Sequence, residues 1–516
     1  MPKPVWLTVM VMLSLLAVQC GQPERATIDL EELTVSRIHQ AYADGQYTCA
    51  QLVQAYIDRI RRYDAKINAI TIVNPRAVEI ARALDRELED TGKLRALHGV
   101  PMIVKDNFNT RGLPTTGGAL ALKDFIPAAD AFMVARLKKA GAVIIAKSNM
   151  AEWAFSPMHT ESSTAGTTRN PYNPEYVPAG SSGGTAAAIA ANFGVIGLGT
   201  DTGNSIRGPS SHNALAGFRP TLGLVSRHGI IPLYLRNDVG GPMCRTVEDA
   251  ARVLEVIAAY DPNDPITRRC AGRIPEGYTR FLDRNGLKGA RIGVLRELSE
   301  DNPDPEISAL FEKAIADIRS AGGEIVDPVT IPGFNDLRKH QWCDVFRKDI
   351  EAFLAEFVKR EDMRTLEDII RAGSDSAYAK ESLEYFATHS GRPEHPEIPC
   401  RDAYADVRRV AFREAIEKSM NDARLDAIIY PTWNNRPARI DAYREEYRGD
   451  NNQIIAPHTG QPAFTVPMGV TKGNLPAGLQ FLGRMFAEPT LIRLAYAYEQ
   501  ATRHRTLPPR FPFSRK

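Results

Sequence analysis

Three short segments of the sequence carry residue types suited to serine hydrolysis. They are residues 104–107, Val-Lys-Asp-Asn, residues 180–184, Gly-Ser-Ser-Gly-Gly, and residues 199–207, Gly-Thr-Asp-Thr-Gly-Asn-Ser-Ile-Arg. A serine hydroxyl is a poor nucleophile at neutral pH and needs a base and a site that stabilises an oxyanion. Glycines let the backbone approach a substrate closely. Two serines and one lysine could therefore supply a nucleophile, a proton relay and a base without a histidine.

Lys105 can act as a base only if it is neutral at working pH. An ordinary lysine has a pKa near ~10.4, so a pKa near 7 requires roughly 4–5 kcal/mol of destabilised charge. The apolar run over residues 100–104 directly precedes this lysine, and burial beneath it would contribute to such a shift. The alternative is a structural lysine held in a salt bridge.

Other nucleophile and base combinations have less support. His212 and His228 follow Ser205 and invite comparison with a Ser-His-Asp triad, which needs a base in contact with the serine and an acid that orients it. Neither histidine has an obvious acidic partner in the sequence. Cys244 has no accompanying base motif. The trio of two serines and Lys105 is the stronger hypothesis.

Composition describes a globular chain without a nucleic-acid partner. The 516 residues are 43% hydrophobic, and 64 basic against 62 acidic side chains leave a net charge of +2. A nucleic-acid-binding protein normally carries a basic face or stripe. The basic side chains near the C-terminus are more simply interpreted as a solvated end.

The N-terminus differs from the rest of the chain. Lys3 precedes an apolar stretch over residues 5–18, which is shorter than the roughly 20 residues of a membrane-spanning helix. A basic start, an apolar centre and a small-residue exit are typical of a secretory signal, predicted here for residues 1–20, with a buried helix as the alternative. Residues 17–21 resemble a bacterial lipoprotein cleavage site with Cys20 as the lipidated residue, although Gln19 departs from that pattern. We expect an exported bacterial protein, periplasmic or anchored to the membrane, with lipidation at Cys20 left open.

The cysteines indicate no metal site. The sequence has six, namely Cys20, Cys49, Cys244, Cys270, Cys343 and Cys400. None are spaced as metal ligands, and no metal or organic cofactor is predicted. Without Cys20, five remain. An odd number argues against a complete disulfide framework but leaves room for one disulfide.

Hydrophobic patterns predict an α/β protein. Two helices are expected within residues 28–69, with others over 75–89, 130–140, 185–192, 247–258 and 306–321. Buried strands are expected over 99–104, 142–146, 195–199, 291–295, 426–432 and 463–467. Helix and strand alternate, as in parallel or mixed sheets. Residues 340–420 are charged, helical and the least regular part.

At its serine clusters the chain resembles the amidase signature family. The matching positions include Lys105, Ser181, Ser182 and Ser205, and the resemblance extends over nearly everything after residue 28. Further matches are Gly-Phe-Arg-Pro-Thr at 217–221, Pro-Ala-Phe-Thr-Val-Pro at 462–467 and Gly-Leu-Gln-Phe-Leu-Gly at 478–483. Each piece alone is weak, but their order and gaps together are specific.

This resemblance implies a fold and a mechanism. The family fold is a large mixed, twisted sheet flanked by helices on both sides, here a single amidase domain over residues 28–510 in which 340–420 is a variable helical region on the substrate side. Carried over, Ser205 is the nucleophile, Lys105 is the general base, and Ser181 relays the proton from a backbone held with a cis peptide. Catalysis passes through an acyl-serine.

The resemblance also implies an oxyanion hole formed by backbone N–H groups of Thr202, Gly203, Asn204 and Ser205. The family commonly has two glycines before the nucleophile, whereas Asn204 replaces the second one here. The N–H donors survive this change, so we expect activity with an altered substrate shape. Ser182, Asp201 and Arg207 are expected to support the loop rather than react.

We therefore predict an amidase that converts a small-molecule carboxylic amide to an acid and ammonia or an amine. A glutaminase subunit of a tRNA-dependent amidotransferase is one alternative, although the export signal argues against it. A non-catalytic binding protein on the same fold is another. The sequence specifies neither the physiological amide nor the oligomeric state.

Overall fold

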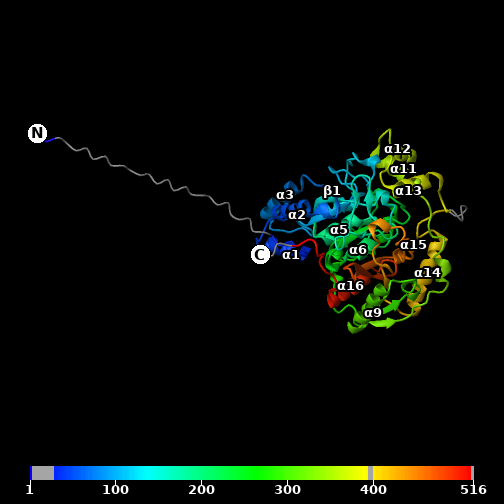
Figure 1. Cartoon of the computed structure of the whole chain (residues 1–516). Helices are drawn as coiled ribbons and strands as arrows, with labels where there is room; N and C mark the ends of the chain where they lie inside the picture. Colours follow the sequence, from blue (N-terminus) through cyan, green and yellow to red (C-terminus); the bar gives the residue numbers. More distant parts are fainter. Residues whose placement is uncertain (3–27, 393–398, 513–516) are drawn as a thin grey trace.

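An eleven-stranded mixed β-sheet runs through the molecule, and helices cover it (Figure 1). This computed structural model describes residues 1–2, 28–392 and 399–512. In order across the sheet the strands are β1 (Ile70–Val73), β3 (Val143–Ser148), β2 (Pro101–Lys105), β6 (Ile196–Asp201), β8 (Val239–Cys244), β7 (Ala216–Arg219), β12 (Ala463–Val470), β13 (Pro476–Leu482), β11 (Ala427–Pro431), β9 (Arg291–Val294) and β10 (Glu324–Val326). Strand β2 is parallel to β3 and β6, and β9 is parallel to β10 and β11, whereas the other pairs are antiparallel. The predicted mixed α/β fold is confirmed.

The sheet is packed between helices. The main helices are α1 (Val35–Ala43), α2 (Cys49–Tyr63), α3 (Ala77–Thr91), α4 (Phe132–Lys139), α5 (Gly183–Ala190), α6 (Arg207–His212), α7 (Val247–Ile257), α9 (Pro305–Ser320), α11 (Phe346–Phe353), α12 (Leu366–Ala372), α13 (Ala377–Thr388), α14 (Val407–Asp422) and α16 (Glu488–Thr502). Figure 1 shows α1, α2 and α3 at one end of the molecule, with α11, α12, α13 and α14 far from them. The C-terminal segment returns to the N-terminal helices, where Arg59 Nη2 donates 2.9 Å to the carbonyl of Phe511.

Close contacts at glycines show that helices lie on both faces of the sheet. A Cβ on Gly197 of β6 would lie 2.7 Å from a methyl of Thr185 in α5, whereas a Cβ on Gly240 of β8 would lie 2.2 Å from Met133 in α4. Gly197 pairs with Met243, which lies three residues from Gly240. Because side chains alternate between faces along a strand, α4 and α5 cover opposite faces. The expected helices on both sides are confirmed.

Most of the predicted elements are confirmed with ends shifted by a few residues. The predicted strands over 99–104, 142–146, 195–199, 291–295, 426–432 and 463–467 correspond to β2, β3, β6, β9, β11 and β12. The sequence patterns did not predict seven strands of the described chain, namely β1, β7, β8, β10 and β13 of the large sheet and the two-residue strands β4 (Glu161–Ser162) and β5 (Gly166–Thr167). Helix α5 begins two residues before its predicted start.

Strand β8 was missed because its sequence, Val-Gly-Gly-Pro-Met-Cys, is typical of a turn. It is nevertheless a central strand between β6 and β7. A Cβ on Gly241 would lie 2.2 Å from the carbonyl oxygen of Phe218 on β7. Glycine is therefore required there by the neighbouring backbone and not by a turn.

Residues 340–420 form the helices α11, α12, α13 and α14 and contain a disulfide. Cys343 and Cys400 are joined across a separation of 57 residues, while Cys49, Cys244 and Cys270 are free and buried. Residues 3–20 of the predicted signal, Cys20 included, lie outside the described part of the chain. Within the described ranges, no helix combines the length and apolar character needed to cross a bilayer.

Candidate active site

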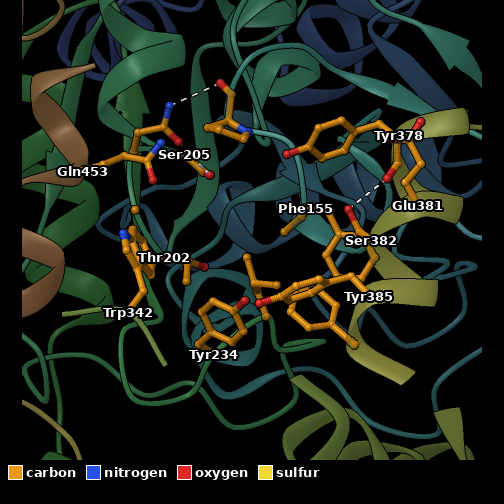
Figure 2. Close-up of a pocket in the computed structure, with 16 residues that line it drawn as sticks. Phe155, Thr202, Ser205, Tyr234, Trp342, Tyr378, Glu381, Ser382, Tyr385 and Gln453 are labelled. Carbon is orange, nitrogen blue, oxygen red and sulfur yellow. Dashed lines mark hydrogen bonds between the residues drawn. The ribbon is translucent and has the colours of Figure 1, made fainter. Parts of the chain in front are cut away.

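A cavity of about 430 Å³ lies beside the second serine cluster (Figure 2). Thr202, Gly203, Asn204 and Ser205 form one part of its wall. Aromatic side chains dominate the remainder. These are Phe155, Tyr234, Trp342, Tyr378, Tyr385 and Phe386. Three of them, Tyr378, Tyr385 and Phe386, come from helix α13.

Lys105 lies at the end of β2 and is fully buried. Its Nζ donates to Ser181 Oγ at 2.7 Å and to Thr200 Oγ1 at 2.8 Å. Burial lowers the pKa of Lys105 to about 7, against the opposing influence of Asp238 and Asp201. No carboxylate lies within salt-bridge distance of Nζ in the described part of the chain. The geometry therefore suits a neutral amine at neutral pH.

Ser181 follows a tightly enclosed glycine. A Cβ on Gly180 would lie 2.3 Å from the carbonyl oxygen of His159, so only glycine fits there without movement of the backbone. The Gly180–Ser181 peptide is cis, in agreement with the expectation from the family resemblance. Ser182, next along the chain, donates to the carbonyl oxygen of Thr200 at 3.1 Å and ties this turn to β6.

Ser205 lies between β6 and α6 on the wall of the cavity. Its hydroxyl donates to Asn204 Oδ1 at 3.3 Å. Among the described residues, no hydrogen bond joins Ser205 Oγ to Ser181 Oγ or to Lys105 Nζ. The structure thus brings Lys105 and Ser181 into direct contact and places Ser205 on the cavity, with its hydroxyl directed to Asn204.

The backbone around Ser205 has unused donors. The N–H groups of Gly203, Asn204 and Ser205 find no acceptor within the described ranges, while the N–H of Ile206 donates to Asp201 Oδ2 at 3.1 Å. Buried backbone N–H groups are nearly always paired. Unpaired donors in a row along a cavity wall are suited to bind a ligand oxygen.

Asp201 and Arg207 hold the loop that carries Ser205 in place. Arg207 Nε donates to Asp201 Oδ2 at 3.1 Å, and Arg207 Nη2 donates to the carbonyl oxygen of Gly203 at 2.7 Å. Arg219 Nη1 donates to the other oxygen of Asp201 at 2.8 Å. Burial alone would raise the pKa of Asp201, but the two guanidinium groups outweigh it and lower the pKa to about 2. The carboxylate is therefore charged, and both of its oxygens accept hydrogen bonds from guanidinium groups, which leaves it no role as a base.

Sequence reasoning missed several residues of this site. Thr200 lies in the second serine segment, residues 199–207, but the sequence pattern assigned it no function. In the structure its hydroxyl also accepts a hydrogen bond from Asn107 Nδ2 at 3.0 Å. Asp450 and Gln453 adjoin Asn204 and the cavity, and no sequence pattern marks them. The aromatic wall from α13 is equally unmarked, because aromatic residues on an amphipathic helix usually indicate a core-facing side.

The alternative nucleophile and base assignments lack the necessary contacts. His212 is buried with neither ring nitrogen hydrogen-bonded within the described part, and burial lowers its pKa to about 3. His228 Nε2 is paired with Glu356 at 3.1 Å. Cys244 is buried in β8, where burial raises the pKa of its thiol. Within the described part of the chain, none of the three forms a hydrogen bond with the Ser205 hydroxyl, whose partner is Asn204.

Comparison with known proteins identifies the family. The sequence model of the amidase family, described as Amidase, matches residues 51–492. A probable amidase of Arabidopsis thaliana is 34% identical over 505 residues, covering 94% of this chain and 93% of that protein. A glutamyl-tRNA(Gln) amidotransferase subunit of Symbiobacterium thermophilum is also 34% identical, covering 92% of this chain and 97% of its own.

Among solved structures, the native peptide amidase of Stenotrophomonas maltophilia is 35% identical, with a TM-score of 0.78 over 93% of this chain and 98% of that one. Fold, motifs and relatives agree with one another. The chain belongs to the amidase signature family and is an amide-hydrolysing enzyme.

Proposed function

We propose that Lys105, Ser181 and Ser205 are the catalytic residues and that the N–H groups of Thr202, Gly203, Asn204 and Ser205 form the oxyanion hole. The observation that carries this proposal is the contact between Lys105 Nζ and Ser181 Oγ at 2.7 Å, at a lysine whose pKa is about 7. Asp201, Arg207 and Ser182 hold the two loops in place.

The reaction then proceeds in two halves. Ser205 Oγ attacks the amide carbon as its proton passes to Ser181, whose own proton passes to neutral Lys105. The carbonyl oxygen gains charge and is stabilised by the backbone N–H groups. Return of the proton to the amide nitrogen releases ammonia or an amine and leaves an acyl-Ser205. Water then cleaves this ester, giving the acid and restoring the serine.

The cavity favours an apolar or aromatic acyl group, including that of a peptide amide. Six aromatic rings line it, and no lysine, arginine or histidine is among the residues of its wall. Its single carboxylate, Glu381, is paired with Arg444 at 2.8 Å. Burying the α-carboxylate of free glutamine here would leave a charge without a partner, which is costly. The similarity to a peptide amidase supports the same choice.

Substitution of the three catalytic residues tests this proposal. Ser205→Ala, Ser181→Ala and Lys105→Ala should each lower kcat/KM for a primary amide of an aromatic acid by more than about a thousand-fold. Retained turnover in Ser205→Ala would overturn the assignment. A fluorophosphonate that labels the wild type but not Ser205→Ala would exclude a non-catalytic binding protein. Faster turnover of glutamine than of aromatic amides would favour the glutaminase alternative.

We also propose that the protein is exported and that residues 28–510 form one domain. The signal-like segment over residues 1–20 and the Cys343–Cys400 disulfide support export, because disulfides persist mainly in oxidising compartments. Cell fractionation should find the mature protein outside the cytoplasm. If Cys20 carries a lipid, Cys20→Ser should move the protein from the membrane fraction to the soluble fraction. A purely cytoplasmic protein would contradict the proposal.

A further inference from the structure

Asn204 lies next to the nucleophile, at a position where the family commonly has glycine, and its side chain is fixed at both ends. Asn204 Nδ2 donates to Asp450 Oδ2 at 2.9 Å and to the carbonyl oxygen of Pro157 at 3.2 Å. Its other end, Oδ1, accepts the hydroxyl of Ser205 at 3.3 Å. The side chain is almost fully buried and belongs to the cavity wall.

The two acceptors determine which way the amide points. A carboxylate and a carbonyl both accept hydrogen bonds, so the NH₂ group must face them and the oxygen must face Ser205. Asp450 is itself half-buried and held, since Asn452 Nδ2 donates to Oδ1 at 3.1 Å and Tyr447 Oη donates to Oδ2 at 3.1 Å. Asn204 therefore presents a fixed acceptor oxygen beside the nucleophile.

The surroundings provide space for this side chain. A Cβ on Gly208, one helical turn along the chain, would lie 3.0 Å from Asn204 Nδ2. That distance is shorter than an ordinary van der Waals contact. Because Gly208 has no side chain, the amide group of Asn204 has room in its observed position. The loop is thus fitted to an asparagine and does not merely tolerate one.

We propose that Asn204, oriented by Asp450, is a specificity residue that selects substrates whose leaving group carries an N–H. The inference rests on the proposed role of Ser205 as nucleophile. When Ser205 Oγ attacks, it and the leaving nitrogen become bonded to the same carbon, so an acceptor near one is within reach of the other. Asn204 Oδ1 then exchanges the hydroxyl of Ser205 for an N–H of the substrate, and the hydroxyl turns toward Ser181.

This exchange separates amides from esters. A primary amide offers Asn204 Oδ1 a donor in place of the one it gives up. An ester offers an oxygen, which cannot donate, so the bond between Ser205 and Asn204 is lost without replacement. Loss of the Asn204 oxygen should therefore lower amide turnover relative to ester turnover.

The test compares Asn204→Ala with the wild type on the primary amide and the methyl ester of one aromatic acid. We expect the ratio of kcat/KM for amide over ester to fall about three- to ten-fold, the value of one neutral hydrogen bond. Asn421→Ala, at an exposed asparagine on α14 that accepts a bond from Arg484 Nε, is the matched control and should keep the wild-type ratio. An equal change for both substrates in Asn204→Ala would overturn the proposal.

A second variant keeps the proposal testable if Asn204→Ala does not fold. Asp450→Asn preserves volume but removes the charge that orients the Asn204 amide, so the amide-to-ester ratio should fall in the same direction. An unchanged ratio in this variant would overturn the proposal. Failure of the catalytic assignment would look different, because Ser205→Ala would then retain activity on both substrates.

Discussion

Lys105 Nζ lies 2.7 Å from Ser181 Oγ, and both side chains are fully buried. The lysine comes from the end of β2 and the serine from the turn before α5. Because water cannot solvate an ammonium there, the neutral amine is favoured and its nearest acceptor is a serine hydroxyl. This relationship couples the pH dependence of the enzyme to one buried group.

The activity should rise with pH through about 7. Lys105 serves as a base only when it is neutral, and its pKa is about 7. The value of kcat/KM should therefore fall tenfold for each pH unit below about 7 and level off above it. A pH profile of kcat/KM for a neutral primary amide measures this. Lys105→Arg, whose side chain stays protonated, should be nearly inactive at every pH. A profile that is flat between pH 5 and 8 would contradict the assignment.

Removal of the charge on Asp201 should destabilise the fold. Asp201→Asn leaves Arg207 and Arg219 buried without their shared carboxylate, which costs about 3–5 kcal/mol of unfolding free energy. Urea unfolding followed by circular dichroism measures the loss. A variant as stable as the wild type would show that other partners satisfy both guanidinium groups.

The same carboxylate makes stability depend on pH in acid. The pKa of Asp201 is about 2 in the folded protein and 3.8 in its ordinary state. Because the folded pKa is the lower one, the unfolded chain binds the proton first as the pH falls. The contribution of Asp201 is therefore complete above about pH 4 and is lost between about pH 4 and 2. Unfolding curves of the wild type and Asp201→Asn should converge over that interval.

The Cys343–Cys400 disulfide should stabilise the wall of the cavity. It closes a separation of 57 residues and adjoins Trp342, whose ring would lie 3.1 Å from a Cβ on Gly203. The double variant Cys343→Ser, Cys400→Ser should lose about 4 kcal/mol by the loop-entropy estimate and raise KM for aromatic amides more than it lowers kcat. Thermal melts and kinetics measure both. An unchanged KM would show that the disulfide does not influence the wall of the cavity.

A methyl group at Gly241 should disrupt the centre of the sheet. In Gly241→Ala the new Cβ would lie 2.2 Å from the backbone oxygen of Phe218, so strands β7 and β8 must separate. We expect a loss of about 1–3 kcal/mol or more, the usual cost of overpacking. Gly277→Ala is a control, since the atom nearest its new Cβ belongs to the flexible side chain of Glu255. Equal melting temperatures for wild type and Gly241→Ala would refute the argument.

The amino-acid sequence by itself determined the class of fold, the family and the residues available for chemistry. Apolar runs such as residues 100–104 are long enough to identify buried strands, and the glycine-serine segments around Ser181 and Ser205 are contiguous, so their residue types can be assigned without coordinates. These features are local. Local patterns are what a sequence expresses directly.

Tertiary structure decided what depends on distant partners. Strand β8 is a strand because β6 and β7 lie on either side of it, despite its turn-like glycines. The pKa of Lys105 follows from burial, and the acceptor beside Ser205 is oriented by Asp450, which lies 246 residues from Asn204 in sequence. Packing across such separations has no local signature. For this reason the pKa of Lys105, the cavity wall and the substrate preference could be argued only from the folded molecule.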